Sequence, residues 1–423
     1  MSSKPVIVFV SSVYPSQHSP LCEELNRSGL AEAWFMTHPS HAAKYGPTAT
    51  NVIPFQPDGD IMGEPPYFYL GKQDRSARIS RGVLTALQAF EAEKKKKIDV
   101  VVCHYFWGSP QFLYDEIDAA IVSYVEYPSF RMHGWDPKYP PTEGQRLADV
   151  QNEMLTFHQV VRSDLTIVPT EFAKSLLPVE LQSRARAQFE AMEFGDLTPH
   201  PRTEKRFTLA FSARDLSSCK GLELYARVVD RLVKRRIKMR FLAIGSEKTA
   251  TYSFEPQWLE TTYGNKDISF LEHLMVHHSG ARAIEAPGRM PYDEFSKLLS
   301  QVDLFLYPLK NGVGNWGIVE IMARGGCVIA TDNAFLPEII KDGVNGVLLP
   351  DDADDLWVEK VIELRNDPEQ RARLSAAARE TGLSYRAELL APKFMQLFYE
   401  AMAIRDRRMG RAAAVVPMRA AVS

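Results

Sequence analysis

Residues 207–221 read FTLAFSARDLSSCKG, and an amphipathic helical pattern, LELYARVVDRLVKR, follows at 222–235. An apolar run, a polar turn and a helix in this order form the repeating unit of a parallel α/β sheet. Arg214 and Lys220 lie in the turn, at the carboxyl end of the predicted strand, where such sheets bind ligands. The bidentate guanidinium of an arginine and the ammonium of a lysine together suit a diphosphate. Gly221 lets the backbone approach such a ligand at a helix start, where backbone amide groups favour anions. Spacing alone leaves open that these are two solvated surface cations.

The same alternation of short apolar runs and longer helical patterns extends along the chain in both directions. Continuous apolar strands separated by helices indicate parallel sheets that are buried on both faces. A polar, proline-containing stretch, DLTPHPRTEKR, separates two such series. The predicted strands are Val6–Val10, Val100–Cys103, Ile121–Val125, Leu165–Val168, Thr208–Phe211, Phe241–Ile244, Ala283–Glu285, Leu304–Tyr307, Val328–Ala330 and Gly346–Leu349.

We therefore predict an α/β fold with two doubly wound, Rossmann-like domains facing each other across a cleft. A chain of 423 residues is also too long for one ordinary core. The predicted boundaries are an N-terminal domain at 1–195, a linker at 196–206, a C-terminal domain at 207–385, a helix at 386–405 that packs back on the first domain, and a disordered basic tail at 406–423.

Composition excludes several classes of protein. The net charge of −3 gives no electrostatic case for binding nucleic acid. The four cysteines are far apart and form no CxxC pair, which argues against a zinc site and fits a reducing compartment. No stretch approaches the roughly 20 apolar residues that span a bilayer. We expect a cytoplasmic protein, with peripheral contact at the inner face of the membrane left open and the oligomeric state unknown.

Three ordered motifs in the second half resemble a known family. EIMARGG begins at Glu320, VIATD follows it, and PEIIKDGVNG begins at Pro337. Together with the spacing of Arg214, Lys220 and Gly221, they resemble the donor-binding half of the retaining glycosyltransferases of family 4, of the glycosyltransferase group 1 type, which have the GT-B fold. The resemblance covers about 130 residues and implies a nucleotide-sugar donor, such as a UDP- or GDP-sugar.

The resemblance implies a role for each matching residue. Arg214 and Lys220 would hold the donor diphosphate and neutralise it during catalysis, so that neither a metal nor another cofactor is needed. Glu320 would accept hydrogen bonds from the ribose hydroxyls, although an acid at a helix start is also stabilised by the helix dipole alone. The remaining donor-binding residues would be Gly221, Gly245, Gly288, Arg289, Gly314, Asn315, Trp316 and Gly317.

One departure concerns the loop YPLKNGVGNWG. The family carries a first glutamate eight positions before the second, where this chain has Gly312. That acid contacts sugar hydroxyls in the family, so its loss affects the identity of the donor sugar and, to a lesser degree, the activity. Gly312 and Gly314 keep the loop permissive for phosphate binding by the backbone.

The first half is more divergent, as expected if it selects a glycan or lipid-linked acceptor. His104 and Glu126 each follow a predicted strand, and both are candidate catalytic residues. We expect Glu126 to orient the acceptor hydroxyl or to take its proton. A strand-end polar residue and a satisfied core histidine are the structural alternatives. The candidate acceptor-binding residues are Ser16, Gln17, Trp107 and Trp135, the last in a Pro- and Gly-rich segment, 130–146, that we expect to form a loop at the rim of the cleft.

Two other patterns imitate functional motifs. Asp352-Ala353-Asp354 has the D-x-D spacing of a metal site, but it directly precedes a helical pattern, where aspartates act as caps. The basic runs at 93–97 and 233–240, like the basic tail, read as solvated surface charge, with contact to anionic lipid as the alternative.

The sequence thus predicts a retaining, metal-independent hexosyltransferase that uses a nucleotide sugar in the synthesis of a surface polysaccharide or glycolipid. Two alternatives stay open. One is a GT-B disaccharide phosphorylase, and the other is a catalytically silent nucleotide-sugar-binding or scaffold protein, which the loss at Gly312 would favour. A Rossmann dehydrogenase is disfavoured because no GxGxxG follows the first strand of either domain.

Overall fold

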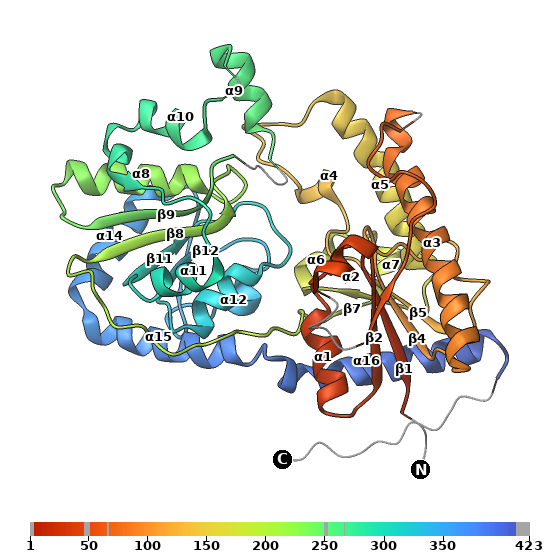
Figure 1. Cartoon of the computed structure of the whole chain (residues 1–423). Coiled ribbons are helices and arrows are strands. Elements are labelled where there is room, and N and C mark those ends of the chain that lie inside the picture. Colours follow the sequence, from red (N-terminus) through yellow and green to blue (C-terminus); the bar gives the residue numbers. More distant parts are fainter. Residues whose placement is uncertain (1–3, 46–50, 66, 249–252, 266, 412–423) are drawn as a thin grey trace. The chain divides into compact units, whose positions relative to one another are not determined.

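The computed structural model describes residues 4–45, 51–65, 67–248, 253–265 and 267–411. The chain divides into two compact units, each built on its own sheet (Figure 1). Unit 1 comprises Met1–Ser129, Gly144–Glu193 and Arg386–Ser423, and unit 2 comprises Phe130–Glu143 and Phe194–Tyr385. Residues 130–143 thus group with unit 2, although the sequence suggested that they belong to the first domain.

Unit 1 contains a seven-stranded sheet in which all neighbouring strands are parallel, in the order β3-β2-β1-β4-β5-β6-β7. Its central strands are continuous apolar runs, buried along their whole length because helices cover both faces. The strands are β1 (Val6–Val10), β2 (Glu32–Thr37), β3 (Val52–Pro54), β4 (Val100–His104), β5 (Ala120–Tyr124), β6 (Leu165–Val168) and β7 (Ala185–Ala187). The helices are α1 (Ser19–Arg27), α2 (Pro39–Tyr45), η1 (Phe68–Leu70), α3 (Gly71–Lys94), α5 (Glu143–Arg162), α6 (Glu171–Ser175), α7 (Val179–Gln182) and α16 (Ala387–Arg408).

Unit 2 contains a six-stranded parallel sheet in the order β10-β9-β8-β11-β12-β13. Its strands are β8 (Thr208–Asp215), β9 (Arg240–Ser246), β10 (Ile284–Glu285), β11 (Leu304–Tyr307), β12 (Val328–Thr331) and β13 (Val347–Leu349). Its helices are α4 (Phe130–His133), α8 (Leu222–Lys234), α9 (Glu255–Tyr263), α10 (Phe270–His277), η2 (Ser279–Ala283), α11 (Tyr292–Leu299), α12 (Trp316–Ala323), α13 (Leu336–Ile339), α14 (Asp354–Asn366) and α15 (Pro368–Leu383).

The predicted α/β class is confirmed, and each predicted strand is present within a few residues. Three strands of unit 1, namely β2, β3 and β7, are absent from the prediction. β2 mixes charged and apolar residues, β3 ends in a proline, and β7 is only three residues long, so none of them gives an apolar signal.

The last helix, α16, contacts α1 and β5 of unit 1. It continues to Arg408, past the predicted end at 405, and the Arg408 guanidinium bonds the buried Asp164 carboxylate, with 2.9 Å between Nε and Oδ1. This ion pair explains why the first residues of the predicted tail are helical. The remainder of that tail, 412–423, lies outside the described residues. None of the helices in the described part of the chain has the length and apolar composition needed to cross a bilayer.

Helices α12 and α15 pack closely in unit 2, and this contact fixes the helix that carries Glu320. At Gly382 of α15, a side-chain Cβ would lie only 2.2 Å from the backbone nitrogen of Ala323. The two backbones can therefore approach each other only because residue 382 has no side chain.

We predict that Gly382→Ala lowers the free energy of unfolding by about 1–3 kcal/mol, the usual cost of overpacking a core. Urea denaturation monitored by circular dichroism measures it. Glu380→Ala, at an exposed position of the same helix, is the control and should change stability by less than about 0.5 kcal/mol. Equal stability of the two variants would show that the helix contact has room to adjust.

Candidate functional site

The order of strands in unit 2 reverses direction between β8 and β11, which are neighbours in the sheet. In parallel sheets, ligands bind at such a switch point, beyond the carboxyl ends of the strands. The turn that follows β8 contains the sequence-predicted cations, and the loop that follows β11 contains Gly312 and Gly314. The topology therefore brings together two segments about 100 residues apart in sequence.

The turn after β8 presents both predicted cations. The side chain of Arg214 is 61% exposed, and its Nε lies 3.6 Å from Oδ2 of Asp215, so the guanidinium remains accessible to a ligand. Lys220 is half-buried and directly precedes Gly221. Gly221 has a φ of 84°, and a Cβ there would lie 1.7 Å from the carbonyl oxygen of Pro308. Only glycine fits at this point of contact between the two loops.

Hydrogen bonds also join the two loops. The carbonyl of Cys219 accepts from the backbone amides of Lys310 and Asn311, each at 3.1 Å. The turn that carries Lys220 therefore has a fixed position relative to the loop after β11.

The backbone amides of the turn are largely used within the protein. The Gly221 amide donates to Ser218 O at 2.8 Å, and the Leu222 amide donates to Ser217 O at 3.3 Å. These two amides are therefore engaged within the turn, while anion binding by the amides further along the start of this helix stays a prediction. The Arg214 and Lys220 side chains are the charged donors of this turn.

Helix α12 begins where the sequence predicts. Asn315 is its N-cap, and the side-chain Oδ1 accepts from the Gly317 amide at 2.8 Å. Trp316 is the first residue of the helix and is half-buried, as are Gly314 and Gly317. The carboxyl group of Glu320 lies one turn further along.

Two residues that the sequence analysis missed hold Glu320. Its Oε1 accepts from the hydroxyl of Tyr292 at 2.6 Å and from Nε of Arg324 at 2.9 Å. Burial and this hydrogen bond raise the pKa of Tyr292 to about 12, so it stays a protonated donor. Arg324 also bonds the hydroxyl of Ser296 at 2.7 Å. Both bonds to Glu320 end on Oε1, and in the described part of the chain Oε2 has no hydrogen-bond partner. The i, i+4 spacing to Arg324 was the available sequence signal.

Three further predicted residues lie at the same edge of the sheet. Gly245 is in β9, where a Cβ would come within 2.6 Å of the Ala213 carbonyl oxygen. Gly288 and Arg289 follow the short edge strand β10, and Gly288 has a φ of 77°. Gly245 thus lies beside the strand that carries Arg214, because β9 pairs with β8.

The segment at residues 130–143 lies on the loop after β11. Asp136, which is 4% exposed, accepts from Lys310 Nζ at 2.7 Å. Asn311 Nδ2 donates to the backbone carbonyl of His133 at 2.9 Å, and the Gly312 amide donates to His133 Nε2 at 3.3 Å. Three consecutive loop residues are therefore each bonded by this segment. Burial lowers the pKa of His133, which favours the neutral imidazole that accepts this bond.

An aromatic residue anchors the same segment in the core of unit 2. Tyr139 is 1% exposed and packs edge-on against Trp258 and Phe270, with ring centroids 5.2 Å and 5.3 Å away. Lys138 forms an ion pair with Glu223 at the start of α8. The segment is therefore a packed part of the unit and differs from the rim loop that we expected.

Unit 1 has a second switch point, between β1 and β4. The loops after these strands are joined there, because the amide and the hydroxyl of Ser12 both donate to the carbonyl of Trp107, at 2.8 Å and 2.7 Å. Three predicted residues converge at this edge: Gln17 Nε2 lies 3.2 Å from Glu126 Oε2, and His104 Nε2 lies 3.3 Å from the same oxygen.

The hydrogen bonds of His104 define the tautomer of its ring. Its Nδ1 accepts from the amides of Phe106 and Trp107, at 3.2 Å and 3.1 Å, so the proton of the neutral ring is on Nε2 and points to Glu126. His104 is 2% exposed. The ring therefore contacts the Glu126 carboxylate through Nε2, and a catalytic role for His104 stays a prediction.

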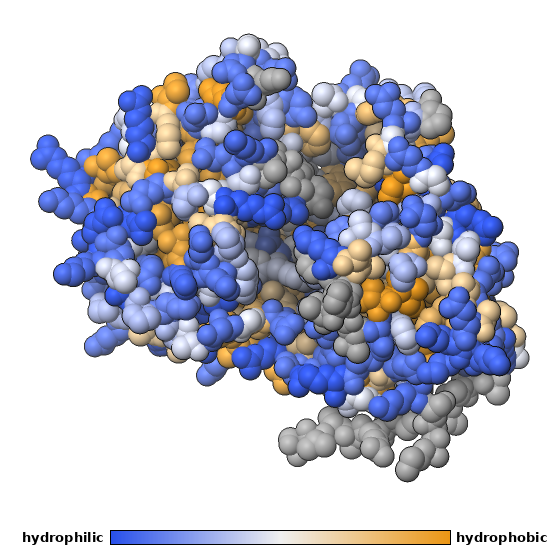
Figure 2. All heavy atoms as spheres, in the orientation of Figure 1, coloured by the Kyte–Doolittle hydropathy of each residue, from blue (hydrophilic) through white to orange (hydrophobic). Residues whose placement is uncertain are grey.

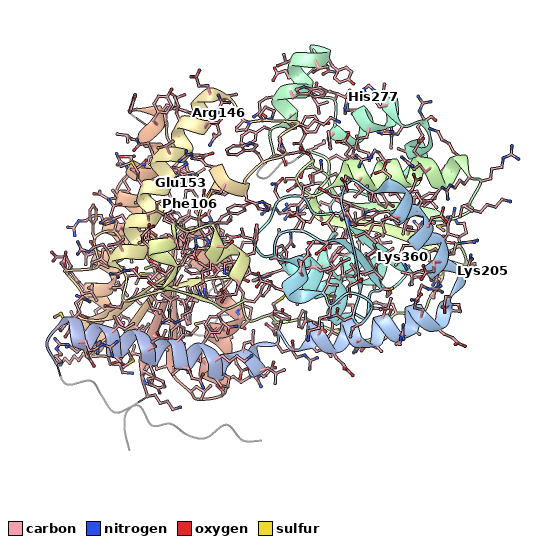
Figure 3. All side chains as sticks on the ribbon, turned by 180° about the vertical axis from the view of Figure 1, so that it is seen from behind. Phe106, Arg146, Glu153, Lys205, His277 and Lys360 are labelled. Carbon is pink, nitrogen blue, oxygen red and sulfur yellow. The ribbon has the colours of Figure 1, made fainter. Side chains whose placement is uncertain are left out.

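The four predicted acceptor residues divide between the units. Ser16 donates its amide to Ser19 Oγ at 2.8 Å and so shapes the start of α1. Trp107 contacts the ring of Phe106 edge-on, with 4.5 Å between the ring centroids. Figure 3 labels Phe106 and also Glu153, which lies on α5 of the same unit. Gln17 lies at Glu126, as described above. Trp135, by contrast, belongs to the segment at residues 130–143 of unit 2.

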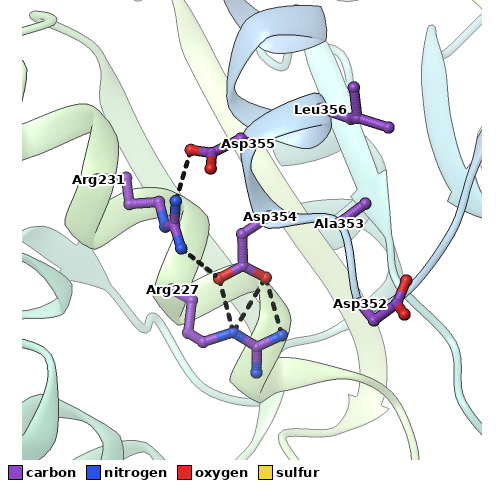
Figure 4. A pocket seen from close by; sticks show the side chains of 7 residues that line it. All are labelled: Arg227, Arg231, Asp352, Ala353, Asp354, Asp355 and Leu356. Atoms are coloured by element: carbon purple, nitrogen blue, oxygen red, sulfur yellow. Dashed lines mark hydrogen bonds and ion pairs between the residues drawn. The ribbon is translucent and has the colours of Figure 1, made fainter.

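Ion pairs account for the D-x-D pattern. Asp354 is the first residue of α14 and not its cap, which corrects our expectation, and its carboxylate bonds Arg227 and Arg231 while Asp352 points away (Figure 4). Within the described ranges no group of three or more His, Cys, Asp or Glu residues could hold a metal ion.

Some residues of the basic runs at 93–97 and 233–240 form ion pairs with acidic residues. Lys96 bonds Glu32, and Arg240 bonds Glu285, each at 2.7 Å. Figure 2 shows hydrophilic residues over most of the visible surface, with hydrophobic residues scattered among them. These ion pairs partly neutralise the charge of the two runs.

Family models match both halves of the chain. Residues 30–195 match the glycosyl transferase family 4 group, and residues 197–381 match glycosyl transferases group 1. An uncharacterized glycosyltransferase from Methanocaldococcus jannaschii is 33% identical over 110 residues, which is 26% of this chain and 31% of that protein. The chain thus matches about a third of the length of this curated relative.

Solved structures resemble the whole chain. Sucrose-phosphate synthase from Thermosynechococcus elongatus is 14% identical, with a TM-score of 0.67 over 95% of this chain and 99% of that chain. A glycosyltransferase from Rickettsia africae is 11% identical, with a TM-score of 0.64 and the same coverage. HepE from Anabaena, in complex with UDP, is 12% identical, with a TM-score of 0.59 over 93% of this chain and 99% of that chain. The chain has the GT-B fold and belongs to the glycosyltransferase family 4 group, with a second half of the group 1 type.

Proposed function

We propose that the chain is a retaining, metal-independent glycosyltransferase. It moves a sugar from a UDP- or GDP-sugar to a glycan or lipid-linked acceptor, in the synthesis of a surface polysaccharide or glycolipid. The observation that carries this proposal is the pair of accessible cations, Arg214 and Lys220, at the switch point of unit 2. The solved structures of HepE with UDP and with UDP-glucose support the choice of donor class.

Charge development explains why cations are needed. As the bond from the anomeric carbon to the diphosphate breaks, positive charge grows on the sugar and negative charge grows on the leaving phosphate. Arg214 and Lys220 would donate to this negative charge, and one well-placed donor is worth about 3–4 kcal/mol of transition-state stabilisation. Because these two side chains supply the charge, the step needs no metal ion.

Glu320 would bind the ribose of the donor. Tyr292 and Arg324 fix its carboxylate through Oε1, which leaves Oε2 as the acceptor for a ribose hydroxyl. The ion pair with Arg324 orients the carboxylate, and a hydrogen bond to a carboxylate is stronger than one to a neutral acceptor.

Glu126 would bind the acceptor hydroxyl in unit 1. Gln17 and His104 both donate to its Oε2, so Oε1 is directed to the ligand. A carboxylate in this position orients the hydroxyl and takes its proton as the new glycosidic bond forms. Retention requires attack from the face that the diphosphate leaves.

His133 would replace the missing first glutamate as a contact to the donor sugar. A Cβ at residue 312 would lie 3.0 Å from Leu309 Cδ2 and 3.4 Å from Phe335 Cε1, so the loop has little room for an acid at this position. The imidazole of His133 lies against the Gly312 amide instead. A neutral ring and a carboxylate favour different hydroxyl arrangements, which makes this residue a determinant of the donor sugar.

We predict that Arg214→Ala and Lys220→Ala each lower turnover by about 100-fold or more, the usual effect of removing one such donor. Both should weaken binding of the nucleoside diphosphate much more than binding of the nucleoside, as measured by isothermal titration calorimetry. Arg282→Ala, at an exposed position of η2, is the matched control and should bind as the wild type does. Wild-type rates in both cation variants would refute the proposed site.

Glu126→Gln removes the charge but keeps the shape of the side chain. It should lower turnover by about 100-fold or more, as expected for loss of a general base, while the Kd of the donor stays unchanged. Turnover is measured with a UDP- or GDP-sugar that binds and a mixture of glycan acceptors. Glu116→Gln, which is exposed in the same unit, should behave as wild type. A loss of donor binding in Glu126→Gln would contradict the acceptor role.

For His133, the informative measurement is a panel of sugars on one nucleotide. His133→Ala should raise the KM of the preferred nucleotide sugar and so reduce the discrimination between this sugar and the others. The Kd of the free nucleoside diphosphate should stay unchanged. His133→Gln keeps an acceptor for the Gly312 amide and should be closer to wild type. An unchanged sugar preference in both variants would exclude this residue as a determinant.

A further inference from the structure

A buried carboxylate holds the turn that carries Lys220. Glu255, the first residue of α9, is 1% exposed, and both of its oxygens bond the same residue, Ser218. Oε1 accepts from the Ser218 amide at 3.0 Å, and Oε2 accepts from the Ser218 hydroxyl at 2.8 Å. Ser218 is itself 1% exposed and lies two residues before Lys220.

Neighbouring residues of the turn are fixed in the same way. The hydroxyl of Ser217 donates to Asp215 Oδ1 at 2.5 Å, and Cys219 Sγ lies 2.9 Å from the hydroxyl of Ser253. Three consecutive residues, 217–219, are therefore bonded through buried side chains. Lys220 follows them directly, and Gly221 on its other side is locked against Pro308.

The burial of the Glu255 carboxylate has a free-energy cost that its contacts must offset. Burying a carboxylate carries a large desolvation cost, and burial accordingly raises the pKa of Glu255. Its charge also opposes an anion bound at the turn, as does the charge of the buried Asp215. The compensating gain is geometric, because a two-oxygen contact to one residue fixes both the position and the orientation of the turn.

We propose that Glu255 is a positioning residue that holds Lys220 in place for the donor diphosphate. This inference rests on the proposed function. Without the contact to Ser218, the turn loses one of its supports, and the ammonium group of Lys220 is no longer presented in one direction. The loss falls on recognition of the diphosphate and leaves recognition of the nucleoside unchanged, because Glu320 and its partners lie on α11 and α12.

The test compares three variants by isothermal titration calorimetry with UDP, GDP and the matching nucleosides. Glu255→Ala should weaken nucleoside diphosphate binding about 10-fold or more, with nucleoside binding unchanged. Glu255→Gln can still accept from the Ser218 amide and donate to its hydroxyl, and it should bind within about 3-fold of wild type. Glu260→Ala, an exposed position on the same helix, is the control.

In turnover assays, Glu255→Ala should raise the KM of the donor much more than it lowers kcat, and Glu255→Gln should restore most of that KM. If Glu255→Ala does not fold, Ser218→Ala removes only the hydroxyl bond and should give a smaller shift in the same direction. The proposal would be overturned if Glu255→Ala lost nucleoside and nucleoside diphosphate binding equally. It would also be overturned if neither Glu255→Ala nor Ser218→Ala lost nucleoside diphosphate binding. Wild-type protein that binds neither UDP nor GDP would instead refute the proposed function itself.

Discussion

The contact between Gly221 and the carbonyl of Pro308 is the constraint on which the proposed donor site depends. A Cβ at residue 221 would lie 1.7 Å from that oxygen, so the turn after β8 and the loop after β11 can meet only at a glycine. Their meeting allows the Cys219 carbonyl to accept from two amides of the loop. The position of Lys220 therefore follows from backbone packing and not from a contact of its own side chain.

Both units use the same design. In each, the strand order reverses beside the first strand, and a backbone contact joins the two loops that meet there. Ser12 and Trp107 form this contact in unit 1, as Gly221 and Pro308 do in unit 2. Polar side chains then collect at the switch point, a carboxylate in the first case and two cations in the second. Under the proposed function, this difference in charge suits one edge to a hydroxyl acceptor and the other to a diphosphate.

The sequence predicted the elements with a strong local signal. Apolar runs gave the central strands, and the cations, glycines and glutamate of the second half were placed on the expected turn and helix because their motifs are contiguous. Glu255 and Tyr292 could not be found in this way. Glu255 bonds Ser218, 37 residues away, and Tyr292 bonds Glu320, 28 residues away, and nothing in the local sequence pattern marks these contacts.

The segment at residues 130–143 shows the same limit at larger scale. Its prolines, glycine and aromatics predicted a rim loop, yet Tyr139 is in the core of unit 2 and His133 and Asp136 bond the loop after β11. This segment and Gly312, where the chain departs from the family pattern, are thus in direct contact. Because the contact joins positions 179 residues apart, neither could be interpreted from its local sequence alone.

A crystal structure of the protein with bound UDP or GDP tests the central claim most directly. The account predicts that the diphosphate oxygens lie within hydrogen-bonding distance of both the Arg214 guanidinium and the Lys220 ammonium, with the ribose at Glu320. A diphosphate bound elsewhere, with these two side chains directed away from it, would contradict the account.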